Sequence, residues 1–317
     1  MTYRTLSAGI ALLAVFLAPL AASAQQPQPI AHGPPSARPF LRVDPGMHTA
    51  PIRQIAAGVG CSLLATGSED KSVRLWRVRD GKLVPMSTLR PPIGPDNDGK
   101  VNAVAMAPDG AWLAVGGWNR TGGDHWVYIF QTATGRILTR LGRVSVIERL
   151  AVSRDGRYLA AALRAPDGLR VWRRDDQDGM VWQLVLQSRK DAQLDVKGVA
   201  FDAGGALYTV AYDGKLRRYP PGFKSEPRAV LTRGGRQPYT VAVHPDGDLV
   251  AVGFADEPVV DIYDAKALAW RSATPSVGPG RSNLSSVAWS SDGQRLYAGG
   301  TYSEGGRFVV REWSDRG

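Results

Sequence analysis

The chain of 317 residues carries 39 Lys and Arg against 29 Asp and Glu, which gives a formal net charge of +10. Its 44% hydrophobic content excludes a largely disordered chain, and its single cysteine excludes an intrachain disulfide framework. The 36 glycines and 22 prolines indicate many short elements joined by tight turns.

The first 24 residues have the organisation of a cleavable signal peptide. Arg4 supplies a short positive region, and the apolar run from Ile10 to Leu20 is shorter than the roughly 20 residues that a membrane-spanning helix needs. Ala22-Ser23-Ala24 then provides the small-residue cleavage pattern before Gln25. The sequence therefore predicts an exported protein, periplasmic or extracellular, with no membrane span after cleavage.

Two further segments complete the predicted domain organisation. Residues 25–39 are rich in Pro and Gln and have no apolar periodicity, so they are expected to form a disordered spacer. Residues 40–317 are expected to form one folded domain. Within it, Cys61 is expected to be a buried small residue beside a turn, because no nearby histidine would activate its thiol.

One short pattern recurs six times along residues 40–317. Each copy has an apolar residue, an alanine and, four positions after the alanine, a glycine-containing turn. The steps between successive alanines are 49, 46, 49, 42 and 46 residues, a spacing that indicates a repeat architecture. The six alanines are Ala56, Ala105, Ala151, Ala200, Ala242 and Ala288.

Each copy predicts a four-stranded antiparallel sheet. The alanine lies in the first apolar run, a second run follows the turn, a third ends in an aromatic residue, and a weaker fourth follows in most copies. A sheet of this size cannot bury both faces alone, but sheets packed radially face to face can. We therefore expect an all-β fold, a β-propeller of six four-stranded blades. The third-run aromatics are Trp76, Phe130, Trp172, Tyr219, Tyr263 and Trp313.

The sixth copy has no fourth run after Trp313. The segment Phe40–Val43 precedes the first copy and has no other partner, so we expect it to supply the missing strand and close the last blade. The alternative is that the chain is a fragment of a seven- or eight-bladed propeller.

Two segments carry a family resemblance: residues 68–84, SEDKSVRLWRVRDGKLV, and residues 107–117, APDGAWLAVGG. They resemble blades of the WD-repeat β-propellers, and the likeness extends over residues 40–315. Six-bladed periplasmic propellers of the Tol system are similar in their Asp-Gly turns. The Trp-Asp dipeptide and the Gly-His pair of WD repeats are missing. The resemblance places the family's structural aspartate at Asp70, Asp167 and Asp213.

Functional groups of propellers gather where the innermost strands begin, at the mouth of the central channel. The corresponding positions lie two residues before each apolar-Ala pair, and only one of them is acidic. Because Ca²⁺ prefers about six to eight oxygen ligands, these positions do not predict a metal site. The predicted channel-mouth residues are Arg53, Asn102, Glu148, Lys197, Tyr239 and Ser285.

No other pattern predicts catalysis. The four histidines, His32, His48, His125 and His244, are unpaired in sequence, and no Cys–His dyad, phosphate-binding loop or nucleophile elbow is present. An aspartate before glycine is a turn residue, because its side chain bonds its own backbone. We therefore predict no catalytic residue, no metal site and no cofactor. The repeated turn aspartates are Asp109, Asp155, Asp246 and Asp292.

The leading hypothesis is a non-catalytic, exported scaffold, a monomeric propeller that binds a protein or an anionic envelope component. The basic residues are spread over several loops, which argues against nucleic-acid binding. The alternatives are a propeller hydrolase or lyase that uses the channel mouth, or the sensor portion of a larger protease or signalling protein. Besides the channel-mouth residues, the candidate partner-binding residues are Trp118, Arg143, Arg233, Arg236 and Arg281.

Overall fold

The computed structural model describes residues 45–175, 177–188, 195–275, 282–314 and 316–317. Pro45–Gly317 form one compact unit. The predicted signal peptide, the predicted spacer and the predicted closing strand at Phe40–Val43 lie outside the described residues, as does Arg281.

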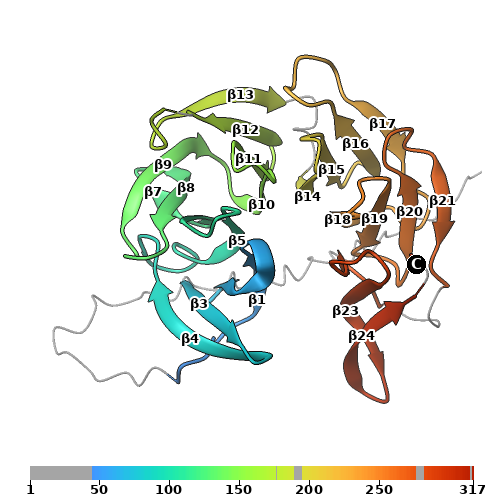
Figure 1. The fold of residues 1–317 in the computed structure, drawn as a ribbon, viewed down its shortest axis with the longest axis horizontal. Coiled ribbons are helices and arrows are strands. Elements are labelled where there is room, and N and C mark those ends of the chain that lie inside the picture. The colour runs from blue at the N-terminus through green and yellow to red at the C-terminus, as the bar shows by residue number, and fades with distance from the viewer. Residues whose placement is uncertain (1–44, 176, 189–194, 276–281, 315) are drawn as a thin grey trace, which may run out of the picture. The chain divides into compact units, whose positions relative to one another are not determined.

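The described chain folds into six consecutive antiparallel sheets placed around a central channel (Figure 1), which confirms the predicted β-propeller. Blade one holds β1 (Ile52–Ala57), β2 (Leu63–Ser68), β3 (Ser72–Arg79) and β4 (Lys82–Leu89). Blade two holds β5 (Val101–Met106), β6 (Trp112–Gly117), β8 (Asp124–Gln131) and β9 (Ile137–Val144), with the short β7 (Arg120–Thr121) paired to β8. Blade three holds β10 (Ile147–Val152), β11 (Tyr158–Leu163), β12 (Leu169–Arg174) and β13 (Trp182–Ser188).

The remaining blades follow the same meander. Blade four holds β14 (Val196–Phe201), β15 (Leu207–Ala211), β16 (Lys215–Tyr219) and β17 (Arg228–Leu231). Blade five holds β18 (Pro238–Val243), β19 (Leu249–Phe254), β20 (Val260–Asp264) and β21 (Trp270–Ala273). Blade six has three described strands, β22 (Ser286–Trp289), β23 (Leu296–Glu304) and β24 (Arg307–Trp313).

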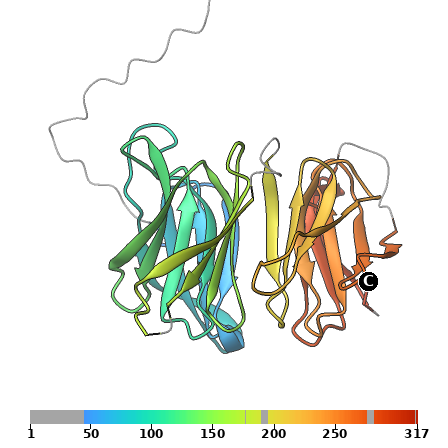
Figure 2. The ribbon, with the colours of Figure 1, turned by 90° about the horizontal axis from the view of Figure 1, so that it is seen from above.

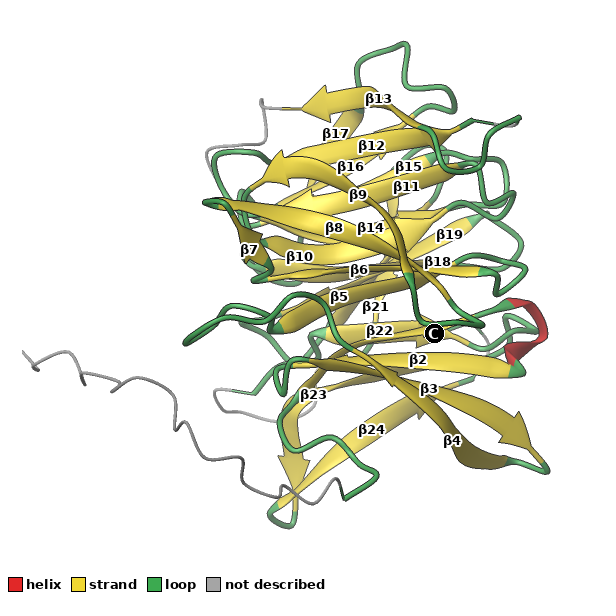
Figure 3. Ribbon diagram, turned by 90° about the vertical axis from the view of Figure 1, so that its left-hand side faces the viewer, coloured by secondary structure: helices red, strands yellow, loops and turns green. Residues whose placement is uncertain are grey.

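The strands of each blade run between two opposite faces, where the connecting loops gather (Figure 2). Within the described ranges the sole helical element is η1, a single 3₁₀ turn at Val59–Cys61 (Figure 3). No helix in this part of the chain has the length and apolar character needed to cross a membrane.

Buried side chains fill the seams between neighbouring blades, which is why the innermost strands are rich in alanine and branched residues. Between blades two and three, for example, Ala105, Ala114 and Ile147 are at most 5% exposed. All six repeat alanines lie in innermost strands, as the sequence predicts. By contrast, Ile55 on β1 and Val310 on β24 are 61% and 72% exposed. Blades one and six, at the two ends of the described chain, therefore retain exposed apolar surface.

Three of the four turn aspartates have the structural role that the sequence predicts, while in blade five the Asp246 N–H donates to His244 Nδ1 instead. The Asp109 carboxylate accepts the N–H of Ala111 at 2.9 Å, and the Asp155 carboxylate accepts the N–H of Arg157 at 3.0 Å. Asp292 does the same in blade six. These carboxylates stabilise the tight connections between the first and second strands.

A chain of side-chain hydrogen bonds runs through blade one. Trp76 Nε1 donates to the Thr66 hydroxyl at 2.8 Å, and that hydroxyl lies 2.7 Å from His48 Nε2. His48 Nδ1 lies 2.8 Å from the Asp70 carboxylate, which also accepts the Ser72 hydroxyl. With the proton on Nδ1, every bond in this chain has one donor and one acceptor. Asp70 thus occupies the structural position that the WD-repeat resemblance assigns to it.

The structure adds one feature to the sequence analysis and corrects another. The Gly-His pair is missing, but His48 follows Gly46 after one intervening residue and enters the network just described. Cys61 is not buried: it is exposed at the end of η1, with a φ of 52°. The short turn projects it to the surface instead of into the seam.

Candidate functional site

The same backbone irregularity occurs near the start of the innermost strand in five blades. The pairing with the second strand shifts by one residue there, which leaves one residue of the innermost strand unpaired. A β-bulge of this kind redirects the side chain of the extra residue. The five bulge residues are Arg53, Asn102, Glu148, Lys197 and Tyr239, which are five of the six predicted channel-mouth residues.

A second set of side chains is held beside the bulges by one repeated backbone hydrogen bond. The residue just after the second strand donates its N–H to the carbonyl two residues before the bulge residue, at 3.0 to 3.2 Å. This bond places the side chains of neighbouring strands at the same end of the channel. In blades one to four the donors are Glu69, Trp118, Arg164 and Tyr212.

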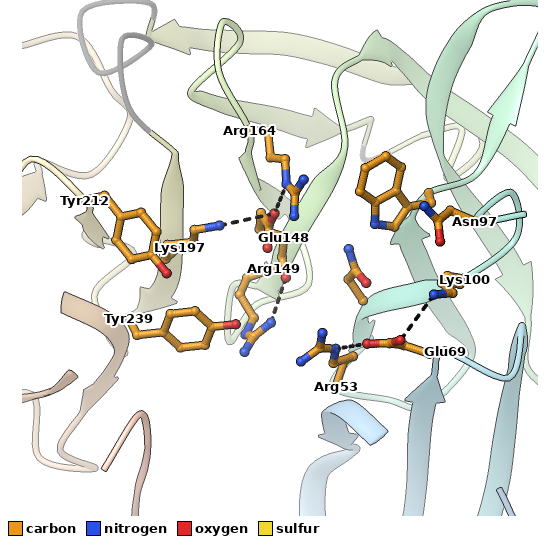
Figure 4. Close-up of a pocket in the computed structure, with 12 residues that line it drawn as sticks. Arg53, Glu69, Asn97, Lys100, Glu148, Arg149, Arg164, Lys197, Tyr212 and Tyr239 are labelled. Atoms are coloured by element: carbon orange, nitrogen blue, oxygen red, sulfur yellow. Dashed lines mark hydrogen bonds and ion pairs between the residues drawn. The ribbon is translucent and has the colours of Figure 1, made fainter. Parts of the chain in front are cut away.

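These two sets surround a pocket of about 390 Å³ at the mouth of the channel (Figure 4). Five cationic side chains and two carboxylates line it, together with three aromatic rings. The lining therefore has an excess of positive charge. Besides the five bulge residues and the four residues that follow second strands, Asn97, Lys100 and Arg149 complete the lining.

Each carboxylate of the pocket is paired with two cations. Glu69 lies 2.6 Å from Arg53 Nε and 3.4 Å from Lys100 Nζ. Glu148 pairs with Arg164 and lies 3.3 Å from Lys197 Nζ. Such pairs fix the positions of long side chains more than they stabilise the fold.

The pair around Glu148 is buried and shifts the titration of its neighbours. The side chains of Glu148 and Lys197 are both 7% exposed, and Lys197 Nζ also lies 2.9 Å from Asp195. Burial would raise the pKa of Asp195, but hydrogen bonds from Lys197 and the Ala165 N–H hold it below its ordinary value. Burial would lower the pKa of Arg164, but its hydrogen bond to Glu148 raises it. Asp195 and Arg164 therefore both stay charged at neutral pH.

Arg149 is bonded differently from the other cations of the pocket. It donates to the backbone carbonyl of Glu148 at 2.8 Å, and its guanidinium lies over the Tyr239 ring at 5.2 Å. No carboxylate in the described part of the chain pairs with it. Arg149 is therefore the one cation of the pocket that none of the described carboxylates offsets.

The aromatic rings support the other cations. Arg164 lies over Trp118 at 4.9 Å and Lys197 lies over Tyr212 at 4.8 Å, both within cation–π range. Burial, with Tyr239 and Glu148 nearby, raises the pKa of Tyr212 to about 12. The Tyr212 hydroxyl is therefore protonated at neutral pH and can donate a hydrogen bond into the pocket.

The other candidate residues lie away from this pocket. Ser285 precedes β22, whose pairing with β23 has no register shift, and it does not line the pocket. Arg143 pairs with Asp124 and its side chain is 73% exposed. Arg233 stacks on Trp270 at 5.0 Å, and the Arg236 N–H is held by Asp256. None of these residues lines the pocket.

Sequence reasoning missed five pocket residues that carry charge or a hydroxyl. Three of them, Glu69, Arg164 and Tyr212, each directly follow a second strand, so the repeat alignment contains the signal that would have found them. Lys100 and Arg149 flank the predicted positions Asn102 and Glu148 and could have been found only from the bulge geometry.

One cluster elsewhere offers metal-ligand atoms. His244, Asp246 and Asp248 present ligand atoms within 4.8 Å of one another, near the turn of blade five. The Arg316 guanidinium lies 2.8 Å from Asp248 in the same cluster, so a protein cation already pairs with these carboxylates. At the channel mouth, Glu69 and Glu148 are each held by two cations.

Comparison with known proteins agrees with this geometry. A family model described as "WD domain, G-beta repeat" matches residues 46–77 and 85–130, which span blade one and most of blade two. The matched region includes the network of His48, Asp70 and Trp76. Blade one and most of blade two therefore match the WD-repeat family, and the described chain as a whole has the β-propeller fold. Blades three to six lie outside the matched segments and have the same antiparallel meander, with different buried side chains.

Two curated relatives match part of the chain. Small ribosomal subunit protein RACK1y of Oryza sativa subsp. japonica is 29% identical over 158 residues, 49% of this chain and 42% of that protein. Telomerase protein component 1 of Rattus norvegicus is 29% identical over 197 residues, 61% of this chain and 7% of that protein. The chain thus spans less than half the length of either relative.

Proposed function

We propose that this WD-repeat propeller is a non-catalytic, exported binding platform whose channel mouth recognises an acidic partner protein or another anionic envelope component. The observation that carries the proposal is the pocket lining, in which five cations and three aromatic rings are set against two carboxylates. Arginine and aromatic side chains commonly anchor interfaces. WD-repeat propellers generally act as protein-interaction scaffolds, and the name of the rice relative assigns that protein to a large assembly, the small ribosomal subunit.

The architecture supports binding better than catalysis. The bulge residues are held by sheet backbone in five successive blades, so the mouth is a rigid surface that needs little ordering on binding. A hydrolase or lyase would need carboxylates that are free to exchange protons or hold a metal. An activity screen with and without divalent metal tests that alternative, and a metal-dependent rise in melting temperature would favour it.

Capture of a partner from envelope extract tests the binding proposal. Purified wild-type protein should retain a partner, and Arg53→Glu should reduce retention about tenfold or more, because it reverses one charge of the mouth. Arg136→Glu is the matched control, since Arg136 is an exposed arginine outside the pocket and is not a candidate partner-binding residue. If no partner is retained, or if both variants bind as the wild type does, the channel mouth is not the binding surface.

Export is a separate part of the proposal and rests on residues 1–24. Expression of the full chain in a bacterial host, followed by fractionation and mass spectrometry, should find a protein that begins at Gln25 in the periplasm or the medium. A cytoplasmic protein that retains residues 1–24 would exclude export. Sedimentation of the same material tests the predicted monomer. The sensor alternative predicts that the natural protein has a protease or signalling domain fused to the propeller.

A further inference from the structure

We infer that Arg149 and Arg53 form an oxyanion-binding subsite at the centre of the channel mouth, which takes a carboxylate or phosphate group of the ligand. This inference rests on the proposed function and names the chemical group that the pocket recognises. The two guanidinium groups enter the pocket from innermost strands of different blades, Arg53 from β1 and Arg149 from β10. In Figure 4 both point toward the middle of the mouth.

The first argument is the charge left over at Arg149. Glu148 is already held by Arg164 and Lys197, and Glu69 by Arg53 and Lys100. Arg149 has only a backbone carbonyl and a tyrosine ring as partners within the described ranges. A guanidinium that is partly removed from water and lacks a carboxylate attracts an anion strongly, because the field there is poorly screened.

The second argument is that the subsite is held in place before a ligand arrives. The bond from Arg149 to the Glu148 carbonyl and the contact with the Tyr239 ring restrict the Arg149 side chain. Arg53 is fixed through its Nε, which lies 2.6 Å from Glu69, and its side chain is still 47% exposed. Two guanidinium groups held in this way suit the oxygens of a carboxylate or phosphate, because these oxygens accept paired N–H bonds.

The third argument is size. A pocket of about 390 Å³ is at the small end of ligand sites and suits one anionic group with a few attached atoms. The protonated Tyr212 hydroxyl and the amide of Asn102, which lies 8% exposed, add neutral polar groups to the lining. The pocket thus fits the end of an acidic side chain or a phosphate group, while the rest of the ligand lies across the loops.

Anion-dependent stabilisation of the full purified chain tests the subsite. Inorganic phosphate is titrated in one arm and acetate in the other, in chloride buffer at constant ionic strength, and the melting temperature is followed. Binding to the folded state alone raises the melting temperature in a saturable way. At least one of the two anions should do so for the wild type, and the arm that responds identifies phosphate or carboxylate as the preferred group.

Three variants make the test specific. Arg149→Gln should lower the affinity for the anion about tenfold or more. Its melting temperature without phosphate or acetate should equal or exceed that of the wild type, because the repulsion between two facing cations is removed. Arg149→Lys keeps the charge but loses the paired N–H donors of the guanidinium, so its affinity for the anion should lie between those of the wild type and Arg149→Gln. Arg136→Gln, the matched control at an exposed arginine outside the pocket, should bind as the wild type does.

Failure of the subsite and failure of the proposed function are separable. A wild type that responds to neither anion, or an Arg149→Gln variant whose response is unchanged, overturns the subsite whether or not a partner is captured. An Arg149-dependent response without partner capture supports the subsite and rejects the binding-platform proposal as tested.

Discussion

Blades one and five each contain a carboxylate that is shielded from solvent, partly buried in blade one and fully buried in blade five, and the two are bonded to different residues. In blade one, Asp70 lies in the turn before the third strand and bonds His48, Ser72 and the N–H of Thr49. In blade five, Asp261 lies within the third strand and is 0% exposed. It accepts the N–H groups of Arg233 and Gly234 at 2.9 and 2.8 Å.

The two carboxylates nevertheless perform the same task. Each bonds the backbone of the segment that leads into the innermost strand of its own blade, residues 48–49 for blade one and residues 233–234 for blade five. In blade three, Asp167 holds the N–H of Ser145 in the same way, ahead of β10. The comparison teaches that a blade needs an anchored segment ahead of its innermost strand. The side-chain network of blade one is one of several ways to provide that anchor.

The largest effect is expected from Asp261→Ala in blade five. The substitution removes the acceptor for two backbone N–H groups, for the Tyr263 hydroxyl at 2.8 Å and for Trp270 Nε1 at 3.3 Å. Burial and the neighbouring Asp261 raise the pKa of Tyr263, so its hydroxyl remains a donor without a partner. The free energy of unfolding should fall by about 3 kcal/mol or more, measured by urea denaturation.

Glu257→Ala is the control for this experiment, because Glu257 is an exposed carboxylate of the same blade. It should change the free energy of unfolding by less than about 0.5 kcal/mol. A loss below about 1 kcal/mol for Asp261→Ala would mean that the entry segment of blade five is anchored by other contacts.

Asp70→Asn should give the next largest effect and a change in acid sensitivity. Burial alone would raise the pKa of Asp70, but bonds from Ser72, His48 and the Thr49 N–H hold it below 3.8. A depressed pKa means that the carboxylate stabilises the folded state above pH 3.8, and that this stabilisation is lost as the pH falls below it. We expect a loss of about 2 kcal/mol at pH 7 that shrinks toward acid pH, measured by urea denaturation from pH 3 to pH 7.

Asp80→Asn provides the matched control, since Asp80 is exposed in the β3–β4 turn of the same blade and has a φ of 50°, which asparagine adopts readily. A constant difference between Asp70→Asn and the wild type across this pH range would show that the charge of Asp70 contributes nothing beyond its hydrogen-bonding shape.

Much of the fold could be predicted from the sequence because the repeat is local. The alanines and turns fix the first and second strands of each blade within a few residues, and turn aspartates such as Asp109 act as expected. His48 was missed because its partners Thr66 and Asp70 lie about 20 residues away, and only folding brings them together. Cys61 was misjudged because a 3₁₀ turn replaces the expected β-turn there.

The channel mouth was predicted in part, for a related reason. Counting back from the apolar-Ala pair finds the bulge residues, such as Arg53 and Lys197, because a bulge has the same position in each of these blades. The arginine after a bulge, Arg149, has no counterpart at this position in the other copies, so the repeat cannot mark it. Its lack of a carboxylate partner follows from three-dimensional pairing alone.

The smallest effect should come from removing a single indole N–H in each of the two blades. In blade one, Trp76 Nε1 donates at 2.8 Å to the Thr66 hydroxyl, which is buried, so Trp76→Phe should cost about 1 kcal/mol. In blade five, Trp270 is 38% exposed and its bond to Asp261 is longer, at 3.3 Å. Water can replace that bond, so Trp270→Phe should cost about half as much or less. Equal losses in urea denaturation would contradict the view that the side-chain network matters in blade one and the backbone anchor in blade five.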